Sequence, residues 1–558
     1  MLSLKICQCI IMARKNLHEV IDMTFASAFM SATVGFVFFA SADCMAQALP
    51  GKTGEARVGD VVLKMDFDKP EEREKFTKAP WAKWVKEGDK GPTVLFVDVP
   101  DTEKPGHYKI NMPFDVTAYK GMSLHFQCMA KTEKVTQPPQ PYNGVKYMMH
   151  TVSTAAGQQW KNQDKVFGTF DWKKLSFNMS IPDDLISGDI SLGLENSTGK
   201  VWFKDIVVIV SRGKILPRPA PMVNPPPAYK GHSLPRLRGT MSPNQFKDED
   251  MRVLGQEWNA NLIRWQMTRL WGKANVGRDL GDYDKWIDEE IADLDKALEA
   301  CKKYGLKVVI DLHSPPGGRY DDSSMAMLTE KIYQDHFVKI WEKIATRYKG
   351  NPAVWGYDLI NEPVTGELST DGLADYLGIQ VLAAKAVRKI DPDIPIIIES
   401  DSWDSPEAYT YLEPVNIKNV VYQAHMYYPG TFTHQGVNNN PDTPVSYPGM
   451  IDGKMCDKEA LRKYLQPVRD FQLAYNVHIY IGEFSAIRWA PGDSAYNYLK
   501  DCIEIFEEYG WDWSYHAYRE WNGWSVEYGP DKKDNNPAKE PTERMKLLLG
   551  WFEKNKKP

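Results

Sequence analysis

The sequence predicts two folded domains, an N-terminal antiparallel β-sandwich of the jelly-roll type followed by a (β/α)₈ TIM barrel. Its 558 residues exceed what one ordinary core organises, which favours a multidomain chain. Residues 57–211 alternate short β-type runs with turns, whereas from about residue 237 strands alternate with amphipathic helices. Six prolines between residues 217 and 227 predict an extended linker between the two patterns. We therefore place the sandwich at 52–212, the linker at 213–236 and the barrel at 237–556.

Residues 1–48 are predicted to be a leader. The uncharged stretch 24–41 follows Arg14 and Lys15 and precedes Ala46-Gln47-Ala48, a pattern typical of a secretory signal cleaved after Ala48. This stretch is nearly long enough to span a membrane, but its Ala, Ser, Thr and Gly content makes it only weakly apolar. We expect no stable membrane span in the mature chain, which would be secreted, periplasmic or held at the cell surface.

The composition excludes some partners and favours others. The net charge is −6, and Lys and Arg form no stripe, so we expect no nucleic-acid partner. Aromatic residues make up 12% of the chain, and such side chains stack on sugar rings as well as fill cores.

The seven cysteines indicate neither a disulfide framework nor a zinc site. Three of them fall in the leader, where lipid attachment at Cys44 is an alternative to cleavage, although Asp43 is a poor neighbour for it. The other four are widely spaced without metal-ligand patterns, and we expect packed thiols, with a Cys301–Cys502 bridge as the alternative: Cys128, Cys301, Cys456 and Cys502.

The predicted sandwich resembles the jelly-roll modules that bind carbohydrate beside many polysaccharide-degrading enzymes. Its candidate strands are 61–65, 93–97, 122–126, 175–179 and 201–208. Six aromatic residues are candidates for a sugar-stacking surface, with core packing as the alternative for each: Trp81, Trp84, Tyr142, Tyr147, Trp160 and Trp172.

The second pattern predicts eight strands of a parallel barrel, at 237–240, 261–265, 307–313, 354–360, 394–399, 420–427, 478–483 and 511–517. Helices are predicted between them, for example at 333–348 and 373–390. In the first of these, Phe337, Ile340, Trp341 and Ile344 share one face, as a helix covering a sheet requires. A doubly wound nucleotide-binding sheet is disfavoured because no Gly-rich loop follows the first strand.

Two of the predicted strands end on glutamates, Glu362 in the motif Asn361-Glu362-Pro363 and Glu483 in Gly482-Glu483-Phe484. A single glutamate could be a solvated or ion-paired surface residue. Two carboxylates at the ends of apolar strands are costly without a purpose, and on parallel strands of one barrel they could face each other across a sugar.

The other strands also end on polar residues, namely Arg264, Asp311-Leu312-His313 and His425-Met426-Tyr427. Together with the two glutamate motifs, this set resembles glycoside hydrolase family 5, the cellulase and mannanase family, over about residues 237–555. The resemblance implies a retaining mechanism with Glu362 as acid/base and Glu483 as nucleophile, roughly 5 Å apart.

The same resemblance implies roles for the remaining residues. Arg264 and Tyr427 would keep Glu483 ionised, and Asn361 would bind the sugar 2-hydroxyl. His313 and His425 would shape the subsite around the reacting sugar, although each alone could be a hydrogen-bonded core residue.

The sequence departs from the family at strand eight, where His516 stands near the position of the usual tryptophan. Either Trp521 replaces that tryptophan beneath the substrate or the subsite differs. We expect Glu520 to form an ion pair with Arg519 or another neighbour. Long loops at 314–322 and 429–456 would set specificity, and no metal or cofactor is expected.

The sequence thus predicts a monomeric, retaining, endo-acting β-1,4-glucanase that acts on a polysaccharide or oligosaccharide. The alternatives within enzymes are a β-mannanase, a xyloglucanase or an exo-acting β-glycosidase. The alternative from another class is a carbohydrate-binding protein on an inactive barrel.

Overall fold

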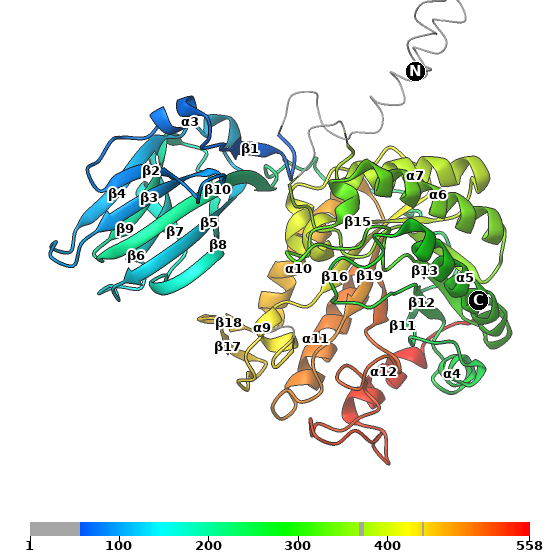
Figure 1. Cartoon of the computed structure of the whole chain (residues 1–558). Helices are drawn as coiled ribbons and strands as arrows, with labels where there is room; N and C mark the ends of the chain where they lie inside the picture. Colours follow the sequence, from blue (N-terminus) through cyan, green and yellow to red (C-terminus); the bar gives the residue numbers. More distant parts are fainter. Residues whose placement is uncertain (1–55, 368–372, 438–439) are drawn as a thin grey trace, which may run out of the picture. The chain divides into compact units, whose positions relative to one another are not determined.

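A computed structural model describes residues 56–367, 373–437 and 440–558 of the chain (Figure 1). The predicted leader lies outside the described residues. Within them, no helix combines the length and apolar character that crossing a membrane requires.

Residues 61–212 contribute two sheets whose strands pair antiparallel. One sheet has the order β2-β3-β10-β5-β8, with β1 also on β10, and the other has the order β4-β9-β6-β7. The strands are β1 (Val61–Lys64), β2 (Ala82–Lys86), β3 (Thr93–Val99), β4 (His107–Pro113), β5 (Ser123–Val135), β6 (Gly144–Ser153), β7 (Gly157–Asn162), β8 (Gly168–Ser180), β9 (Leu185–Glu195) and β10 (Gly199–Arg212).

Side chains from both of these sheets join one buried apolar cluster. In β5 the buried residues alternate with less buried ones, so Leu124, Phe126 and Cys128 face this cluster. All five candidate strand segments fall within strands of these sheets, apart from an end residue in two of them.

The six aromatic candidates of this region differ in exposure, and Trp81, Trp84 and Trp172 are half-buried. Tyr147 is buried in the apolar cluster, and Trp84 packs against Phe67 with ring centroids 4.7 Å apart. By contrast, Tyr142 is 54% exposed and Trp160 is 57% exposed. Only the exposed pair has the free ring surface that a stacking role demands.

Eight parallel strands close into a barrel, which confirms the predicted (β/α)₈ fold. They are β11 (Arg238–Met241), β12 (Leu262–Gln266), β13 (Lys307–Asp311), β14 (Val354–Asp358), β15 (Ile396–Glu399), β16 (Val420–Met426), β19 (Ile479–Phe484) and β20 (Asp512–Tyr515). Strands β13 and β14 end earlier than predicted, so His313 and Glu362 lie just beyond the sheet.

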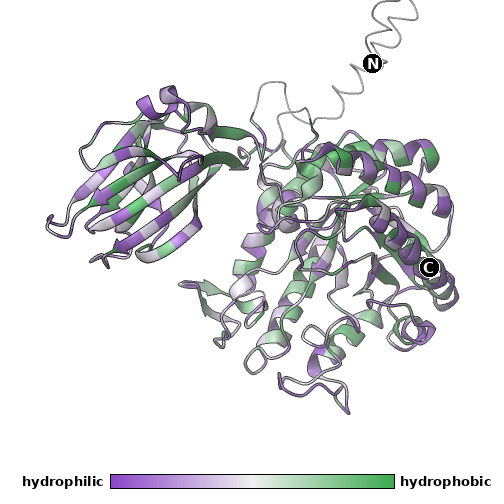
Figure 2. Cartoon of the chain, in the orientation of Figure 1, coloured by the Kyte–Doolittle hydropathy of each residue, from purple (hydrophilic) through white to green (hydrophobic). Residues whose placement is uncertain are grey.

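Helices surround the barrel, and the longer ones are α5 (Leu280–Tyr304), α6 (Lys331–Tyr348), α7 (Tyr376–Ile390), α10 (Lys458–Tyr475), α11 (Ser494–Tyr509) and α12 (Glu543–Phe552). The predicted apolar face of α6 is buried, and in Figure 2 the surrounding helices carry both hydrophobic and hydrophilic residues. Helix α7 begins later than predicted because the Asp375 side chain caps it by accepting a hydrogen bond from Gly378 N.

The loops on the catalytic face contain short elements. Helix α8 (Asp401–Asp404) follows β15, and helix α9 (Gly430–Thr433) with the hairpin β17 (Gly449–Ile451) and β18 (Lys454–Cys456) fills the insertion after β16. The four cysteines of the described chain are free and buried, as predicted for packed thiols, so no Cys301–Cys502 bridge is formed.

Candidate active site

The barrel brings the predicted polar residues together at the carboxyl ends of its strands. Arg264 lies on β12, His425 on β16 and Glu483 on β19, while Glu362 follows β14. One carboxylate oxygen of Glu362, one of Glu483 and a ring nitrogen of His425 lie within 4.8 Å of one another. The two glutamates therefore face each other in one buried site.

Glu483 is held by donors on both of its oxygens. Arg264 Nη1 donates to Oε1 at 2.6 Å, and Tyr427 Oη donates to Oε2 at 2.9 Å. Burial alone would raise the pKa of Glu483, but the imidazoles of His425 and His516 and the Arg264 guanidinium hold that pKa well below its ordinary value. Glu483 is consequently a carboxylate at neutral pH.

Arg264 is fully buried among carboxylates. Its Nε donates to Asp358 at 2.8 Å, and its Nη2 lies 3.2 Å from Asp311 and 3.1 Å from Glu399. Burial would lower the pKa of Arg264, but the surrounding carboxylates, including Glu483, raise it well above its ordinary value. The guanidinium is thus a permanent cation whose plane is fixed by four acids, which in turn fixes the position of Glu483.

Glu362 is held mainly through its backbone. Its N–H donates to Glu399 Oε2 at 2.6 Å, and its φ of +49° lies in the left-handed region. The only described side chain within hydrogen-bonding distance of its carboxylate is His425, whose Nδ1 lies 2.9 Å from Oε1. The sequence analysis missed Glu399, although this residue also ends an apolar run, Ile396–Ile398.

His313 and Asn361 form a chain of hydrogen bonds. His313 Nδ1 lies 2.7 Å from Asp311 Oδ2, and its Nε2 lies 3.2 Å from Asn361 Nδ2. Because Nδ1–H donates to the Asp311 carboxylate, Nε2 carries no proton and accepts from the Asn361 amide. Asn361 Oδ1 in turn accepts from Arg264 Nη2 at 3.0 Å, so its amide orientation is fixed.

Residues 226–526 match the family model described as cellulase (glycosyl hydrolase family 5). The chain belongs to glycoside hydrolase family 5. It is 29% identical over 265 residues to endoglucanase C of Acetivibrio thermocellus, covering 42% of this chain and 75% of that protein. It is 29% identical over 277 residues to cellodextrinase A of Ruminococcus flavefaciens, covering 48% of this chain and 76% of that protein. A solved structure of Thermotoga maritima Cel5A with cellobiose aligns with a TM-score of 0.45 at 23% identity, over 56% of this chain and 97% of that chain.

The strand-eight position of this glycoside hydrolase carries a charged histidine. His516 Nδ1 lies within hydrogen-bonding distance of Tyr427 Oη and 3.3 Å from Glu483 Oε2, and its Nε2 donates to Glu520 Oε2 at 2.8 Å. Burial opposes the charge, but the carboxylates of Glu520 and Glu483 raise the pKa of His516 to about 10. Glu520 therefore pairs with His516, whereas Arg519 pairs with Asp250 and Glu527 instead.

The aromatic residue against His516 is Trp524, which the sequence analysis did not single out. Its ring centroid lies 5.7 Å from that of His516 and 6.0 Å from that of Tyr427. Trp521 is 41% exposed and packs edge-on against Trp489 and Trp524. The four-residue spacing between His516 and Glu520 was the signal for the ion pair, but nothing local marked Trp524.

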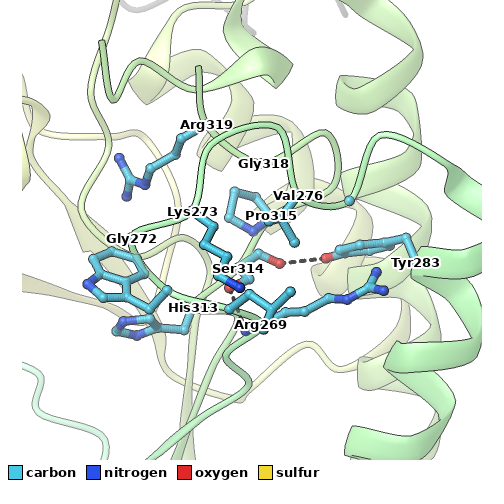
Figure 3. Close-up of a pocket in the computed structure, with 13 residues that line it drawn as sticks. Arg269, Gly272, Lys273, Val276, Tyr283, His313, Ser314, Pro315, Gly318 and Arg319 are labelled. Carbon is cyan, nitrogen blue, oxygen red and sulfur yellow. Dashed lines mark hydrogen bonds between the residues drawn. The ribbon is translucent and has the colours of Figure 1, made fainter. Parts of the chain in front are cut away.

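The loop after β13 lines a hollow beside His313 (Figure 3). Trp271, Ser314, Pro315 and Arg319 contribute to its wall, and the rings of Trp271 and His313 lie 4.6 Å apart. Trp271 is 47% exposed, so part of its indole beside His313 is open to solvent.

Among the residues that the structure describes, three groups of acidic and histidine side chains have the spacing of metal ligands. Two of them share His425 with the glutamates and lie beside the Arg264 cation, which would repel a metal ion. In the third, His232 and His478 each place Nε2 2.7 Å from Asp512 Oδ2, while Leu237 N donates to Oδ1. Hydrogen bonds therefore account for the arrangement of this third group.

Proposed function

We propose that this family 5 hydrolase is a retaining β-glycosidase in which Glu483 is the nucleophile and Glu362 the acid/base. The observation that carries the proposal is the approach of their carboxylate oxygens to within 4.8 Å. Retaining enzymes hold their two carboxyl groups about 5–5.5 Å apart, whereas inverting enzymes leave about 6.5–9.5 Å for a water molecule.

In the first step, Glu483 attacks the anomeric carbon and the bond from that carbon to the glycosidic oxygen breaks. Glu362 gives its proton to the departing oxygen, and a glycosyl ester of Glu483 remains. In the second step, Glu362 takes a proton from water while the water oxygen attacks the same carbon. The ester bond breaks, Glu483 leaves as a carboxylate and Glu362 is protonated again.

The residues around Glu483 keep it ionised, as a nucleophile requires. The Arg264 contact keeps Glu483 ionised before attack, and Tyr427 donates to the oxygen that lies 3.3 Å from His516. Burial and the Glu483 charge raise the pKa of Tyr427 well above its usual range, so it stays a hydrogen-bond donor. Asn361, with its amide oriented by Arg264 and His313, would bind the sugar 2-hydroxyl.

For the substrate, we propose endo-acting hydrolysis of β-1,4-glucan. The names of the relatives support a cellulase-type substrate, since one is an endoglucanase and one a cellodextrinase. A β-mannanase, a xyloglucanase or an exo-acting β-glycosidase remains the alternative, because His516 replaces the usual aromatic floor of the reacting-sugar subsite. Exposed Trp271, Trp403 and Trp521 on the catalytic-face loops are candidates for stacking on further sugars of a chain.

We further propose that the sheets of residues 61–212 form a carbohydrate-binding sandwich. Trp160 on the edge strand β7 is paired across the sheet with His150, and their rings stack at 5.2 Å with an interplanar angle of 16°. Asp189 Oδ2 fixes His150 Nδ1 at 2.7 Å. An exposed indole braced in this way is pre-oriented for stacking on a sugar. Trp160→Ala is expected to abolish retardation of the protein in gels containing soluble β-glucan, whereas unchanged retardation would remove this proposal.

The activity is tested by product release from carboxymethylcellulose, mixed-linkage glucan, xyloglucan, glucomannan and arabinoxylan, with Glu483→Gln as the matched control. Mixed-length oligosaccharides from cellulosic substrates, absent with the variant, are the expected result. Release from glucomannan or xyloglucan alone would identify that polysaccharide as the substrate in place of β-1,4-glucan. Release of a single short product would indicate exo action in place of endo action. Sugar binding without turnover on any substrate would favour a binding protein on an inactive barrel.

A further inference from the structure

Arg319, from the loop after β13, contacts the backbone of the proposed acid/base. Its Nη2 donates to the carbonyl oxygens of Asn361 at 3.0 Å and Glu362 at 2.8 Å, and its Nη1 donates to Ser323 O at 3.1 Å. No carboxylate in the described ranges lies within ion-pair distance of this guanidinium. The Arg319 guanidinium therefore donates its hydrogen bonds to main-chain carbonyl oxygens.

The backbone that Arg319 contacts is strained. Glu362 has a φ of +49°, which a residue with a Cβ adopts at a cost of about 1–3 kcal/mol unless its surroundings enforce it. Glu399 fixes the N–H of Glu362, and Arg319 fixes its C=O. Together they hold both polar backbone groups of this one residue, so the direction of its side chain is determined from two sides.

Arg319 is itself held in place. Its guanidinium carbon lies 5.2 Å from the ring centre of Trp271 and 4.8 Å from that of Trp403, which sandwich it by cation–π contacts. The backbone N–H of Trp403 donates to Pro363 O at 3.1 Å, so the main chain that carries this indole is bound to the residue after Glu362. Figure 3 shows the Arg319 guanidinium on the side of the hollow away from Tyr283.

The charge state of Arg319 is secure at working pH. Burial lowers the pKa of Arg319 to about 10, against the opposing effect of the Glu362 and Glu399 carboxylates, so it is a cation at neutral pH. The planar fork of an arginine can reach two successive carbonyls at once, which a lysine amine cannot do with the same geometry.

We propose that Arg319 is a positioning residue that aims the Glu362 carboxyl at the departing glycosidic oxygen. Releasing the Asn361 and Glu362 carbonyls would let the peptide plane rotate and move the carboxyl, and a displacement of about 1 Å costs roughly 10²-fold in rate. This inference rests on the proposed role of Glu362 as the acid, and it concerns only the proton-transfer part of the first step.

The test compares leaving groups in the full-length protein. The dinitrophenolate of a 2,4-dinitrophenyl β-cellobioside leaves without being protonated, whereas the phenolate of a 4-methylphenyl β-cellobioside needs a proton to leave. For both substrates, kcat/KM reports the first step. Arg319→Met is expected to lower kcat/KM about 30-fold to 10²-fold for the methylphenyl substrate and less than about 3-fold for the dinitrophenyl substrate. Arg319→Lys is expected to recover only part of the loss.

Arg278→Met is the matched control, because Arg278 packs on Tyr320 and pairs with Glu330 without touching Glu362. It is expected to lower both rates equally or not at all. An equal loss on both substrates for Arg319→Met would overturn the proposal, since lost folding or sugar binding does not depend on the leaving group. Glu362→Gln, measured in parallel, separates the acid role of Glu362 from the positioning role of Arg319. If the loss depends strongly on the leaving group in Glu362→Gln but not in Arg319→Met, only the positioning role is excluded. If it does not depend on the leaving group in Glu362→Gln, both roles are excluded.

Discussion

The two facing glutamates are held in opposite ways. Glu483 is fixed through its carboxylate by Arg264 and Tyr427, both from barrel strands or their immediate ends. Glu362 is fixed through its backbone by Glu399 and Arg319, and only His425 among the described side chains hydrogen-bonds its carboxylate. A nucleophile must keep its charge, whereas an acid/base must gain and lose a proton. Cations in contact with a carboxylate serve the first purpose and would defeat the second.

The largest effect is expected from removing the proposed nucleophile. Glu483→Gln is expected to lower kcat by at least about 10⁴-fold, because the carboxylate proposed to form the glycosyl ester is lost. Added azide should restore turnover of the dinitrophenyl cellobioside in a Glu483→Gly variant and give a glycosyl azide of inverted configuration, which nuclear magnetic resonance detects. A Glu483→Gln rate within about tenfold of the wild type would exclude Glu483 as nucleophile.

Removing the cation behind Glu483 should cost stability as well as activity. Arg264→Met leaves Asp311, Asp358 and Glu399 buried without their countercharge. We therefore expect the free energy of unfolding, measured in urea, to fall by about 3–5 kcal/mol. Because Arg264 lowers the pKa of Glu483, the acidic limb of kcat/KM should move to higher pH. Arg238→Met, which removes a buried arginine paired with Glu507, should destabilise without moving that limb. The same shift in both variants would show that the pH profile reports folding only.

His516 tests whether the departure at strand eight serves Glu483. His516→Gln removes a positive charge next to Glu483, so the acidic limb of kcat/KM is expected to move up by about one pH unit. An unchanged pH profile would mean that His516 acts only on Glu520.

The ion pairs of His516 with Glu483 and Glu520 should also contribute to the free energy of unfolding. The pKa of His516 is raised from 6.5 to about 10, so its contribution is fully present below pH 6.5 and is lost as the pH rises toward 10. The difference in unfolding free energy between wild type and His516→Gln should therefore shrink across that window. A constant difference from pH 6 to pH 10 would contradict the charged state of His516.

The smallest expected effect concerns the exposed loop residue Trp521 rather than either glutamate. Trp521→Ala should raise KM for cellohexaose about 2-fold to 10-fold with little change in kcat, if the exposed indole stacks on a distal sugar. A fall in kcat without a change in KM would place Trp521 at the reacting sugar instead.

The sequence contained what was needed to predict the Glu483 side of the site. Arg264, Tyr427 and Glu483 follow apolar strand residues directly, and parallel strands of a barrel bring such positions to one end. Glu399 carried the same signal after Ile396–Ile398 and could have been found in the same way. Asp311 and Asp358 are also strand-end residues, but their use as partners of Arg264 depends on the closed barrel.

The Glu362 side could not be predicted to the same degree. Arg319 lies in a polar loop without periodicity, and only the three-dimensional course of that loop brings it to the Glu362 carbonyl. The left-handed backbone of Glu362 has no sequence signature, because glutamate rarely adopts it. Trp524 likewise reaches His516 through a loop whose path the local sequence does not specify.

The most direct test of the central claim is to trap the intermediate. Incubation with 2,4-dinitrophenyl 2-deoxy-2-fluoro-β-cellobioside, whose glycosyl ester hydrolyses slowly, should add one fluorocellobiosyl group per chain, and peptide mass spectrometry should find it on Glu483. Arg319→Met should still be labelled, because this leaving group needs no acid. Labelling of another residue, or an absence of label together with inverted product configuration, would contradict a retaining mechanism that uses Glu483 as nucleophile.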